Sequence, residues 1–322
     1  MADAEPEAAS GKIVLVMLST GKQGGAVVRA LAKANESAPS DAPPPWLILA
    51  QTRDPTSAKS KALSSLPGVR LHKGTPTDPL PLFTTAPGPV YAVFSVQQSV
   101  DNPKGVAGET VEANALADAA AKHDVKHFVY TSVNFGGAEG KKTYVPHFES
   151  KRLAEEHLQA KHPKLPVTIL RPVTFMDQLV VGDPASAIVR VTKIMFLTQL
   201  KATTRLKLIA CSDIGGVAAL VLQNPDRYIG KDVDLAGDEL SPAELEEGWR
   251  EVFGEEMRPK MMGGGVLAWA IRTGMKELRL MFKFFNEIGF NADIPALREQ
   301  YPELKDWKTF LSTEVKLKSA TA

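Results

Sequence analysis

The chain has 322 residues, 44% of them hydrophobic, which is enough for one large domain with an appendage or for two domains. Its 38 basic and 37 acidic side chains leave a net charge of +1, so we expect no direct binding to nucleic acid and none to an anionic membrane. The single cysteine, Cys211, excludes an internal disulfide and fits a reducing compartment.

The two ends of the chain are predicted to be flexible tails, at 1–10 and 316–322. The first is acidic and has no apolar core, so we do not expect a secretory signal. No segment approaches the roughly 20 consecutive apolar residues that span a bilayer. We therefore expect a cytoplasmic protein, and a nuclear location is also open.

Short apolar runs alternate with helical patterns through the first half of the chain. This alternation indicates parallel strands joined by crossover helices, and hence a doubly wound α/β sheet. The mainly apolar strands agree, because parallel strands are covered on both faces. The predicted strands are 12–18, 46–51, 69–73, 90–96, 127–132 and 167–170, and the predicted helices are 24–35, 109–123 and 148–161.

The pattern changes after about residue 175. We predict a nucleotide-binding domain over 11–175, completed by 210–237. A smaller, mainly helical lobe for a substrate or a partner is predicted over 176–209 and 238–315. The later predicted elements are a helix at 213–223, a strand at 233–236 and helices at 241–253 and 265–287.

The last of these predicted helices carries a basic stripe beside its apolar face. Such a stripe is typical of the solvated edge of a packed helix. The alternatives are a docking face for an acidic partner and the edge of a lid. Its members are Arg272, Lys276, Arg279 and Lys283.

A glycine turn joins the first predicted strand to the first predicted helix. Gly21 and Gly24 retain the last two glycine positions of a dinucleotide-binding turn, whereas Leu18 stands at the first. We expect Leu18 to keep ordinary backbone angles, so that the turn opens differently. Phosphate is bound mainly by backbone N–H groups at the helix N-terminus, and these do not need the missing glycine. The turn therefore predicts an altered phosphate cradle, and the alternative is a bend without a ligand.

The end of the second predicted strand bears on the choice of nucleotide. Arg53 lies where such folds read the adenosine ribose; an acidic residue there favours NAD, whereas arginine suits a 2′-phosphate. Lys22, in the turn, adds a second positive charge. These residues favour NADP(H) over NAD(H). The alternative is that Arg53 is a surface charge paired with Asp54.

Six motifs, in their order along the chain, resemble the NmrA-like family of atypical short-chain dehydrogenases/reductases. The resemblance implies a Rossmann-like domain with a small lobe, and NADP(H) bound across the strand edges. Members of the family range from redox-responsive regulators, which bind nicotinamide nucleotides and partner proteins, to reductases. The motifs lie at Thr20–Gly25, Thr52–Pro55, Val125–Ser132, His147–Lys151, Leu170–Pro172 and Ile294–Leu311.

The resemblance also assigns cofactor-binding positions. It implies a pyrophosphate at the glycine turn, a 2′-phosphate at the end of the second strand and the two riboses beyond the fourth strand and on the 148–161 helix. Thr75 departs from the family, because this position near the adenine is commonly acidic. From the pyrophosphate through the 2′-phosphate to the riboses, the cofactor-binding candidates are Thr20, Gly21, Lys22, Gln23, Gly24, Arg53, Val96, Gln97 and Lys151.

The usual catalytic residues of short-chain dehydrogenases are incomplete. These enzymes use Ser, Tyr and Lys, with tyrosine and lysine four residues apart on one helix face. Ser132 and Lys151 remain here, but His147 stands in place of the tyrosine. Histidine transfers protons near neutral pH, although a lysine one turn away disfavours the imidazolium. Alternatively, His147 only makes a local hydrogen bond and Lys151 binds ribose.

Three functional hypotheses remain open. The first is an NADP(H)-binding, redox-responsive regulator, for which the resemblance implies a transcriptional regulator as partner. The second is an NADPH-dependent oxidoreductase acting on a small apolar carbonyl or enone, with Phe175 and Met176 on the substrate side. The third is a nucleotide-free scaffold. The six histidines show no metal-ligand spacing, so no metal site is predicted.

Overall fold

The computed structural model describes residues 11–39, 45–99, 102–180, 187–257 and 276–316. The predicted tails lie outside these ranges, apart from Lys316. The chain divides into two compact units that interleave along the sequence. The first unit contains Met1–Ser132, Ser150–Leu170 and Ile214–Val233, and the second contains Val133–Glu149, Arg171–Asp213 and Asp234–Ala322.

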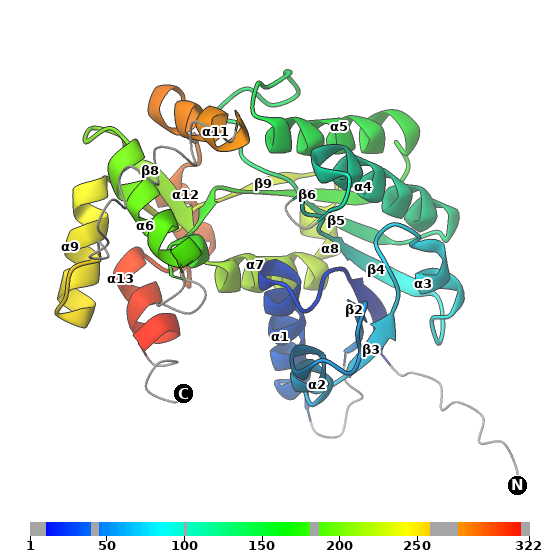
Figure 1. Cartoon of the computed structure of the whole chain (residues 1–322). Coiled ribbons are helices and arrows are strands. Elements are labelled where there is room, and N and C mark those ends of the chain that lie inside the picture. Colours follow the sequence, from blue (N-terminus) through cyan, green and yellow to red (C-terminus); the bar gives the residue numbers. More distant parts are fainter. Residues whose placement is uncertain (1–10, 40–44, 100–101, 181–186, 258–275, 317–322) are drawn as a thin grey trace, which may run out of the picture. The chain divides into compact units, whose positions relative to one another are not determined.

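A seven-stranded sheet in the order β3-β2-β1-β4-β5-β6-β9 organises the first unit, and its strands from β3 to β6 pair in parallel (Figure 1). Strand β2 is buried along its whole length, as expected for a strand that is covered on both faces. The doubly wound prediction is confirmed. The strands are β1 (Lys12–Val16), β2 (Trp46–Thr52), β3 (Val69–Lys73), β4 (Val90–Ser95), β5 (His127–Thr131), β6 (Val167–Pro172) and β9 (Asp232–Leu235).

Helices cover both faces of this sheet. Figure 1 shows α3, α4 and α5 on one face and α1, α2 and α7 on the other. Helices α1 and α7 approach closely, because Gly215 of α7 lies directly against the backbone of Ala26 in α1. These helices are α1 (Lys22–Glu36), α2 (Ala58–Ser64), α3 (Leu80–Thr84), α4 (Gly105–Lys122), α5 (Pro146–Lys161), α7 (Cys211–Gln223) and α8 (Pro225–Tyr228).

The second unit combines helices with a three-stranded sheet in the order β10-β8-β7. This small sheet was not predicted, because its strands are too short to produce a pattern of alternating hydrophobicity. Its strands are β7 (Thr174–Phe175), β8 (Leu206–Ile209) and β10 (Asp238–Leu240). Its helices are η1 (Met176–Leu179), α6 (Ala187–Gln199), α9 (Pro242–Phe253), α11 (Lys276–Glu287), α12 (Ile294–Gln300), α13 (Trp307–Phe310) and η2 (Leu311–Lys316).

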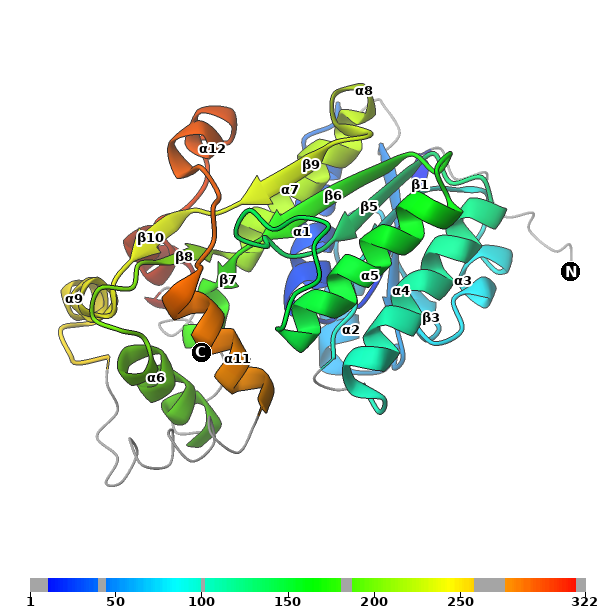
Figure 2. The same cartoon turned by 90° about the horizontal axis from the view of Figure 1, so that it is seen from above.

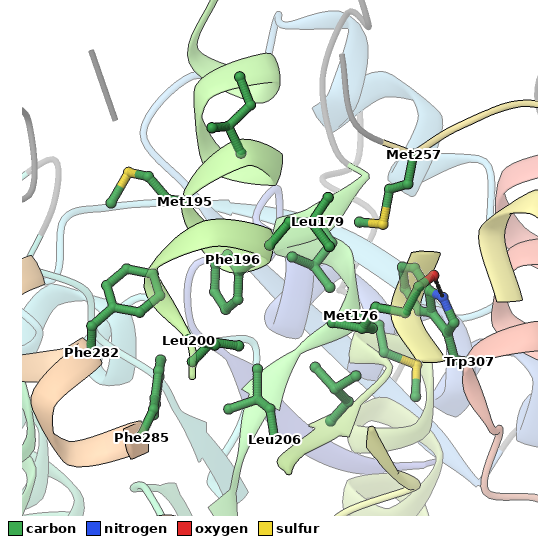
Figure 3. Packing of buried hydrophobic residues seen from close by; sticks show 14 of the residues in the cluster. Met176, Leu179, Met195, Phe196, Leu200, Leu206, Met257, Phe282, Phe285 and Trp307 are labelled. Carbon is green, nitrogen blue, oxygen red and sulfur yellow. Dashed lines mark hydrogen bonds between the residues drawn. The ribbon is translucent and has the colours of Figure 1, made fainter. Parts of the chain in front are cut away.

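The second unit has its own apolar core (Figure 3). Phe196 of α6 contacts Phe282 of α11, with their ring centroids 5.4 Å apart. Trp307 is buried and donates its indole N–H to the Leu245 carbonyl at 3.1 Å, so the one polar atom of this ring is satisfied. This core fixes the C-terminal helices to α6 and α9.

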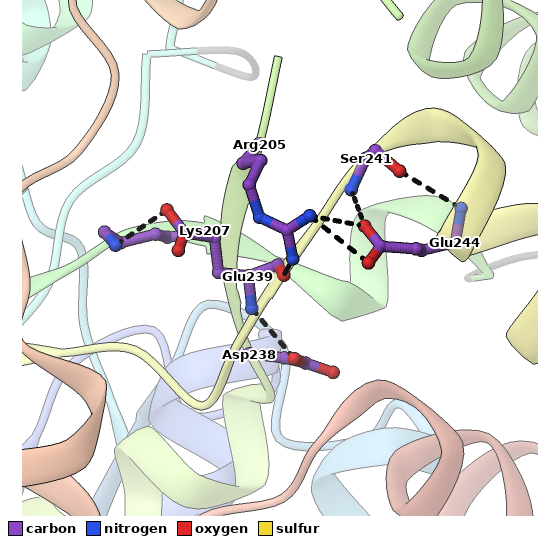
Figure 4. Close-up of polar contacts among 6 residues, drawn as sticks. All are labelled: Arg205, Lys207, Asp238, Glu239, Ser241 and Glu244. Carbon is purple, nitrogen blue, oxygen red and sulfur yellow. Dashed lines mark hydrogen bonds and ion pairs between the residues drawn. The ribbon is translucent and has the colours of Figure 1, made fainter. Parts of the chain in front are cut away.

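The start of α9 confirms a sequence prediction. Ser241 caps the helix by accepting from the Glu244 backbone, and Glu244 in turn accepts from the Ser241 backbone. Figure 4 shows that Arg205, which directly precedes β8, also binds the Glu244 carboxylate with its Nη1, at 2.9 and 3.2 Å to the two oxygens. The predicted 241–253 helix therefore begins as its sequence indicates.

The predicted 265–287 helix is described only from Lys276 onward, and Arg272 lies outside the described residues. Lys276, Arg279 and Lys283 are exposed on α11, and Lys283 pairs with Glu287 at 3.8 Å. The apolar face of α11 is buried through Phe282 and its neighbours. None of the described helices has the length and apolar character needed to cross a membrane.

Candidate dinucleotide-binding site

The turn after β1 differs from the prediction at Leu18. This residue has a φ of +45°, in the left-handed region, so the expectation of ordinary backbone angles is wrong. Strand β1 ends at Val16, two residues earlier than predicted, because the chain then enters this turn. Leu18 therefore has the backbone conformation that glycine normally supplies, at a cost of about 1–2 kcal/mol. The turn keeps its shape without its first glycine.

At an ordinary apolar site, substitution of leucine by glycine destabilises a protein more than substitution by isoleucine. At Leu18 we expect the reverse order. Glycine relieves the strain but loses a half-buried side chain and gains unfolded-state entropy, so the free energy of unfolding should change by less than about 1 kcal/mol. Isoleucine keeps the apolar volume, but its branched Cβ is poorly tolerated at positive φ, so we expect a loss of about 1–2 kcal/mol. Urea unfolding measures both. A stable isoleucine variant together with a severely destabilised glycine variant would contradict the left-handed assignment.

Gln51, near the end of β2, holds the turn in place. Its side-chain oxygen accepts from the Leu18 backbone at 2.9 Å, and its amide donates to the Gly74 carbonyl at 2.7 Å. Its backbone carbonyl accepts from the Ser19 hydroxyl at 2.6 Å. Gln51 and Ser19 are buried. Gln51 was not predicted, because a single polar residue at the end of an apolar strand carries no motif.

Gly24 lets α1 begin directly against the turn. A Cβ atom here would lie 2.4 Å from the carbonyl oxygens of both Met17 and Leu18, so no larger residue fits without moving backbone. The last glycine of a dinucleotide-binding turn normally permits this close packing of helix on strand. At Gly21 a Cβ would lie 3.1 Å from the Leu18 oxygen, which is tight but less severe.

The N-terminus of α1 has the electrostatic character of an anion site. In the described structure, its capping residue, Gly21, provides no side-chain hydrogen bond, and the first turn contains no acidic residue. The first N–H groups of the helix are thus not used by a capping side chain, and Lys22 adds positive charge nearby. Gln23 is oriented by Thr131 at the end of β5, whose hydroxyl donates to the Gln23 side-chain oxygen at 2.8 Å.

Arg53 directly follows β2 and is exposed. The alternative of an Arg53–Asp54 ion pair is not what the described residues show, because the Asp54 carboxylate instead accepts from the Thr56 backbone and hydroxyl at 2.9 and 2.6 Å. Those hydrogen bonds hold the pKa of Asp54 below its usual value, and Lys73 contributes in the same direction. Arg53 thus remains available to a ligand.

Lys73 is a second basic residue at this edge that sequence analysis missed. It ends β3 and pairs in register with Thr52, the residue before Arg53. Thr75, just beyond, forms an isolated bridge with Asp78, whose backbone donates to the Thr75 hydroxyl at 3.3 Å. The backbone of Asp78 thus satisfies the Thr75 hydroxyl.

The end of β4 leads to a buried ion pair. Val96 and Gln97 are buried, and the Gln97 carbonyl accepts from Lys151 Nζ at 3.1 Å. Lys151 also pairs with Glu109 of α4 at 2.9 Å, and the other Glu109 oxygen accepts from the Ser150 hydroxyl at 2.8 Å. Two N–H donors of the Lys151 ammonium therefore already have partners within the first unit. Glu109 was not identified from the sequence.

Two hydroxyl groups on this side of the sheet lack partners among the described residues. Ser132 Oγ and the phenol oxygen of Tyr130 are buried without a hydrogen bond. Burial raises the pKa of Tyr130 well above its ordinary value, and the charges of Glu109 and Glu155 add to this effect. Tyr130 is therefore protonated at neutral pH and cannot act as a base. The Ser132 hydroxyl needs a partner that a ligand can supply.

The remaining candidates lie in the second unit. His147 Nδ1 is 2.8 Å from the Glu277 carboxylate of α11, and this hydrogen bond lowers the pKa of Glu277 despite its partial burial. Phe175 is half-buried, and Met176 is fully buried in the core of the unit. His147 thus has an acidic partner in its own unit, on a helix far along the chain, which the sequence did not predict.

These features fit a nicotinamide dinucleotide. The glycine cradle and the uncapped helix N-terminus suit a pyrophosphate, and the basic residues that follow β2 and end β3 suit an anionic ribose substituent. The buried Ser132 hydroxyl provides an unused donor and acceptor beyond β5.

The parallel sheet, its strand order and the glycine turn define a Rossmann-like fold. The chain belongs to the NmrA-like family, whose sequence profile matches residues 10–311. An NmrA-like family domain-containing protein of Dictyostelium discoideum is 23% identical over 289 residues, which cover 86% of this chain and 88% of that protein.

Solved structures share the fold. NmrA, described as a negative transcriptional regulator, superposes with a TM-score of 0.70 at 17% identity over 97% of this chain and 98% of its own. It has been solved in complex with NAD and with NADP. The Citrobacter sp. triphenylmethane reductase, complexed with NADP(H), has a TM-score of 0.65 at 19% identity over 92% of this chain and 98% of its own.

Proposed function

We propose that this protein binds NADP(H) and acts as a regulator whose conformation depends on the bound nucleotide. The observation that carries the nucleotide assignment is the exposed Arg53 directly after β2, with Lys73 ending the neighbouring strand. An acidic residue at the Arg53 position would bind a free ribose 2′-hydroxyl, whereas arginine complements a 2′-phosphate. The Asp54 carboxylate does not neutralise Arg53, because Thr56 holds it.

Arg53→Ala is expected to weaken NADP⁺ and NADPH binding by roughly 10–150-fold, since a hydrogen bond to a charged group contributes about 1.5–3 kcal/mol. Affinity for NAD⁺ and NADH should hardly change, because they lack the 2′-phosphate. Calorimetric titration of the nucleotide-free protein with all four nucleotides measures these affinities.

Arg70→Ala is the matched control, because Arg70 is an exposed arginine within β3 rather than beyond its carboxyl end. It should leave all four affinities unchanged. An equal loss of NAD⁺ and NADP⁺ binding in the Arg53 variant would argue against recognition of the 2′-phosphate. Failure of all four nucleotides to bind the unmodified protein would favour the nucleotide-free scaffold.

The regulatory role rests on the state of the catalytic positions. Lys151 is paired with Glu109 and bonded to the Gln97 carbonyl, and the tyrosine four residues before it is replaced by His147. The Nδ1 of His147 lies against Glu277. A tyrosine–lysine pair that transfers a proton is therefore missing, whereas the nucleotide cradle is retained. Binding without efficient turnover is what a nucleotide-responsive regulator needs.

The same titrations test the regulatory hypothesis. NADP⁺ and NADPH can shift a conformational equilibrium only if their affinities for two conformations differ. A difference of about tenfold or more between the two Kd values corresponds to roughly 1.4 kcal/mol of coupling and would support redox sensing. Equal affinities would leave a response to nucleotide occupancy only. A partner protein, by family resemblance a transcriptional regulator, would bind one of the two states.

The second candidate is an NADPH-dependent reductase acting on a small apolar carbonyl or enone. One observation favours it: the buried Ser132 hydroxyl has no partner among the described residues and could bind a substrate oxygen. The fold likeness to a triphenylmethane reductase agrees with this possibility. Decay of NADPH absorbance against a carbonyl and enone panel tests it. Turnover that is lost in Ser132→Ala or His147→Ala would replace the regulator proposal.

A further inference from the structure

Three side chains with metal-binding atoms converge on the first unit, far along the sequence from the glycine turn. Asp118 lies in the last turn of α4, His157 lies in α5, and His162 directly follows α5. The Nε2 atoms of both histidines lie 2.6 Å from the same Asp118 oxygen. The ligand atoms of all three residues lie within 4.8 Å of one another.

The packing of two helices creates this cluster. Figures 1 and 2 show α4 and α5 side by side on one face of the sheet. His162 continues the last turn of α5, because its backbone N–H donates to the Leu158 carbonyl at 3.1 Å. The two imidazole rings then meet edge to face, with their centroids 5.4 Å apart. The prediction from spacing missed the cluster because Asp118 comes from a different helix.

The cluster lies near the amino ends of the parallel strands, whereas the dinucleotide cradle lies at their carboxyl ends. The C-terminal ends of α4 and α5 lead into the amino ends of β5 and β6, whereas the glycine turn and Arg53 follow the carboxyl ends of their strands. These three residues lie away from the proposed nucleotide site, so nucleotide binding does not explain why they converge.

We propose that Asp118, His157 and His162 bind a divalent zinc ion, with the fourth position open to water or another ligand. Two imidazole nitrogens and a carboxylate oxygen form a donor set that suits zinc, and three protein ligands with one open position are typical of accessible zinc sites. Without metal, each imidazole can donate its Nε2 proton to the Asp118 carboxylate. On binding, zinc would coordinate the Nε2 lone pair of each ring, and the displaced proton would pass through water to Nδ1 of the same ring, so that both imidazoles stay neutral.

The surroundings of the cluster are consistent with an exchangeable ion. Asp118 is exposed and the two histidines are only partly buried, so solvent reaches the cluster. His162, alone of the three ligands, also lines a surface cavity of about 550 Å³. Lys126, Lys161 and Lys164 line the same cavity; their charges oppose a dication, and an anionic fourth ligand such as hydroxide would offset that repulsion.

The test is a titration of chelator-treated, untagged full-length protein with zinc alone at pH 7.5, where free imidazole is mainly neutral. Calorimetry should show one equivalent bound, and the Tm should rise with zinc concentration. Asp118→Asn, His157→Gln and His162→Gln should each weaken binding at least about tenfold, because each removes one ligand. Cobalt in place of zinc should give the visible absorption of a four-coordinate site.

His72→Gln is the control, because His72 lies in β3 and bonds the Leu82 carbonyl at 2.9 Å outside the cluster. It should bind zinc as the unmodified protein does. The metal-free Tm of each variant separates lost binding from failed folding. If the unmodified protein binds no zinc, or if the three cluster variants bind it as tightly as His72→Gln, the proposal is wrong and the cluster is only a hydrogen-bonded His–Asp–His group.

Discussion

Gly24→Ala is expected to lower the free energy of unfolding by about 3 kcal/mol and to abolish nucleotide binding, because overpacked sites lose about 1–3 kcal/mol and occasionally more. The added Cβ would lie 2.4 Å from two carbonyl oxygens and 2.7 Å from the Leu18 carbonyl carbon. All three are backbone atoms, so the contact can be relieved only by moving α1 away from the turn. That movement displaces the N–H groups at the start of the helix, which form the proposed phosphate site.

Gly216→Ala is the matched control for this variant. Gly216 is also a helical glycine of the first unit, but a Cβ there meets no atom within 4 Å. Alanine should therefore stabilise the protein by about 0.5–1 kcal/mol through its better helix propensity. Gly25→Ala, whose Cβ would lie 2.9 Å from the Ser19 oxygen, should fall between the two. Equilibrium urea unfolding ranks the three variants, and equal stability for Gly24→Ala and Gly216→Ala would contradict the close helix–turn packing.

Glu109→Gln is expected to cost about 3–5 kcal/mol of stability, because it leaves the buried Lys151 ammonium without its counter-charge. Glu109 and the Lys151 side chain are only 4% and 12% exposed, so solvent screens this pair weakly. Glutamine keeps an acceptor for the Ser150 hydroxyl, which isolates the effect of the charge. Lys151→Met should cost a similar amount, since it leaves the Glu109 carboxylate unpaired.

The double variant distinguishes this account from simple loss of packing. With both charges removed, neither is buried alone, so Glu109→Gln/Lys151→Met should be far more stable than the sum of the single effects predicts. Urea unfolding of the four proteins gives the coupling free energy. Additive losses would mean that the two charges do not interact across α4 and α5.

The same pair changes how Lys151 is understood. From the sequence, this lysine is a candidate for ribose binding or catalysis, because it occupies the family's lysine position. In the structure it also joins α4, α5 and the end of β4 through Glu109 and the Gln97 carbonyl. A loss of activity or binding in a Lys151 variant therefore does not by itself prove a role toward the nucleotide. Ser132→Ala is the cleaner test, because the Ser132 hydroxyl has no partner among the described residues.

The sheet of the first unit could be predicted because its strands are short apolar runs with helical patterns between them. Each run is a local signal, and the order of the strands follows from the family's fold. The glycine turn and Arg53 were also found locally. Gln51, Lys73 and Glu109 could not be found in this way, because their importance comes from partners that lie 21 to 42 residues away in the sequence. The role of Asp118 could not be predicted for the same reason, since its two histidine partners lie 39 and 44 residues further along the chain.

Leu18 shows a different limit of sequence reasoning. Residue type predicts backbone conformation through average preferences, and leucine rarely has positive φ. Here the contacts around the turn decide the conformation. The Leu18 N–H is held by Gln51, and its carbonyl accepts from the Gly21 N–H at 2.8 Å. These contacts keep the residue in a conformation that leucine alone would avoid, so a local rule could not predict it.

The interleaving of the two units has a consequence for how the chain can be synthesised and cut. The chain passes from one unit to the other five times, at Ser132, Glu149, Leu170, Asp213 and Val233. A nascent chain released after Ser132 would carry β1 to β5 but lack β6, so β5 would be an unpaired edge strand that can join another chain. It would also lack α5, and Glu109 would have no lysine. Neither unit is therefore a continuous segment that a truncated or fused gene could encode alone.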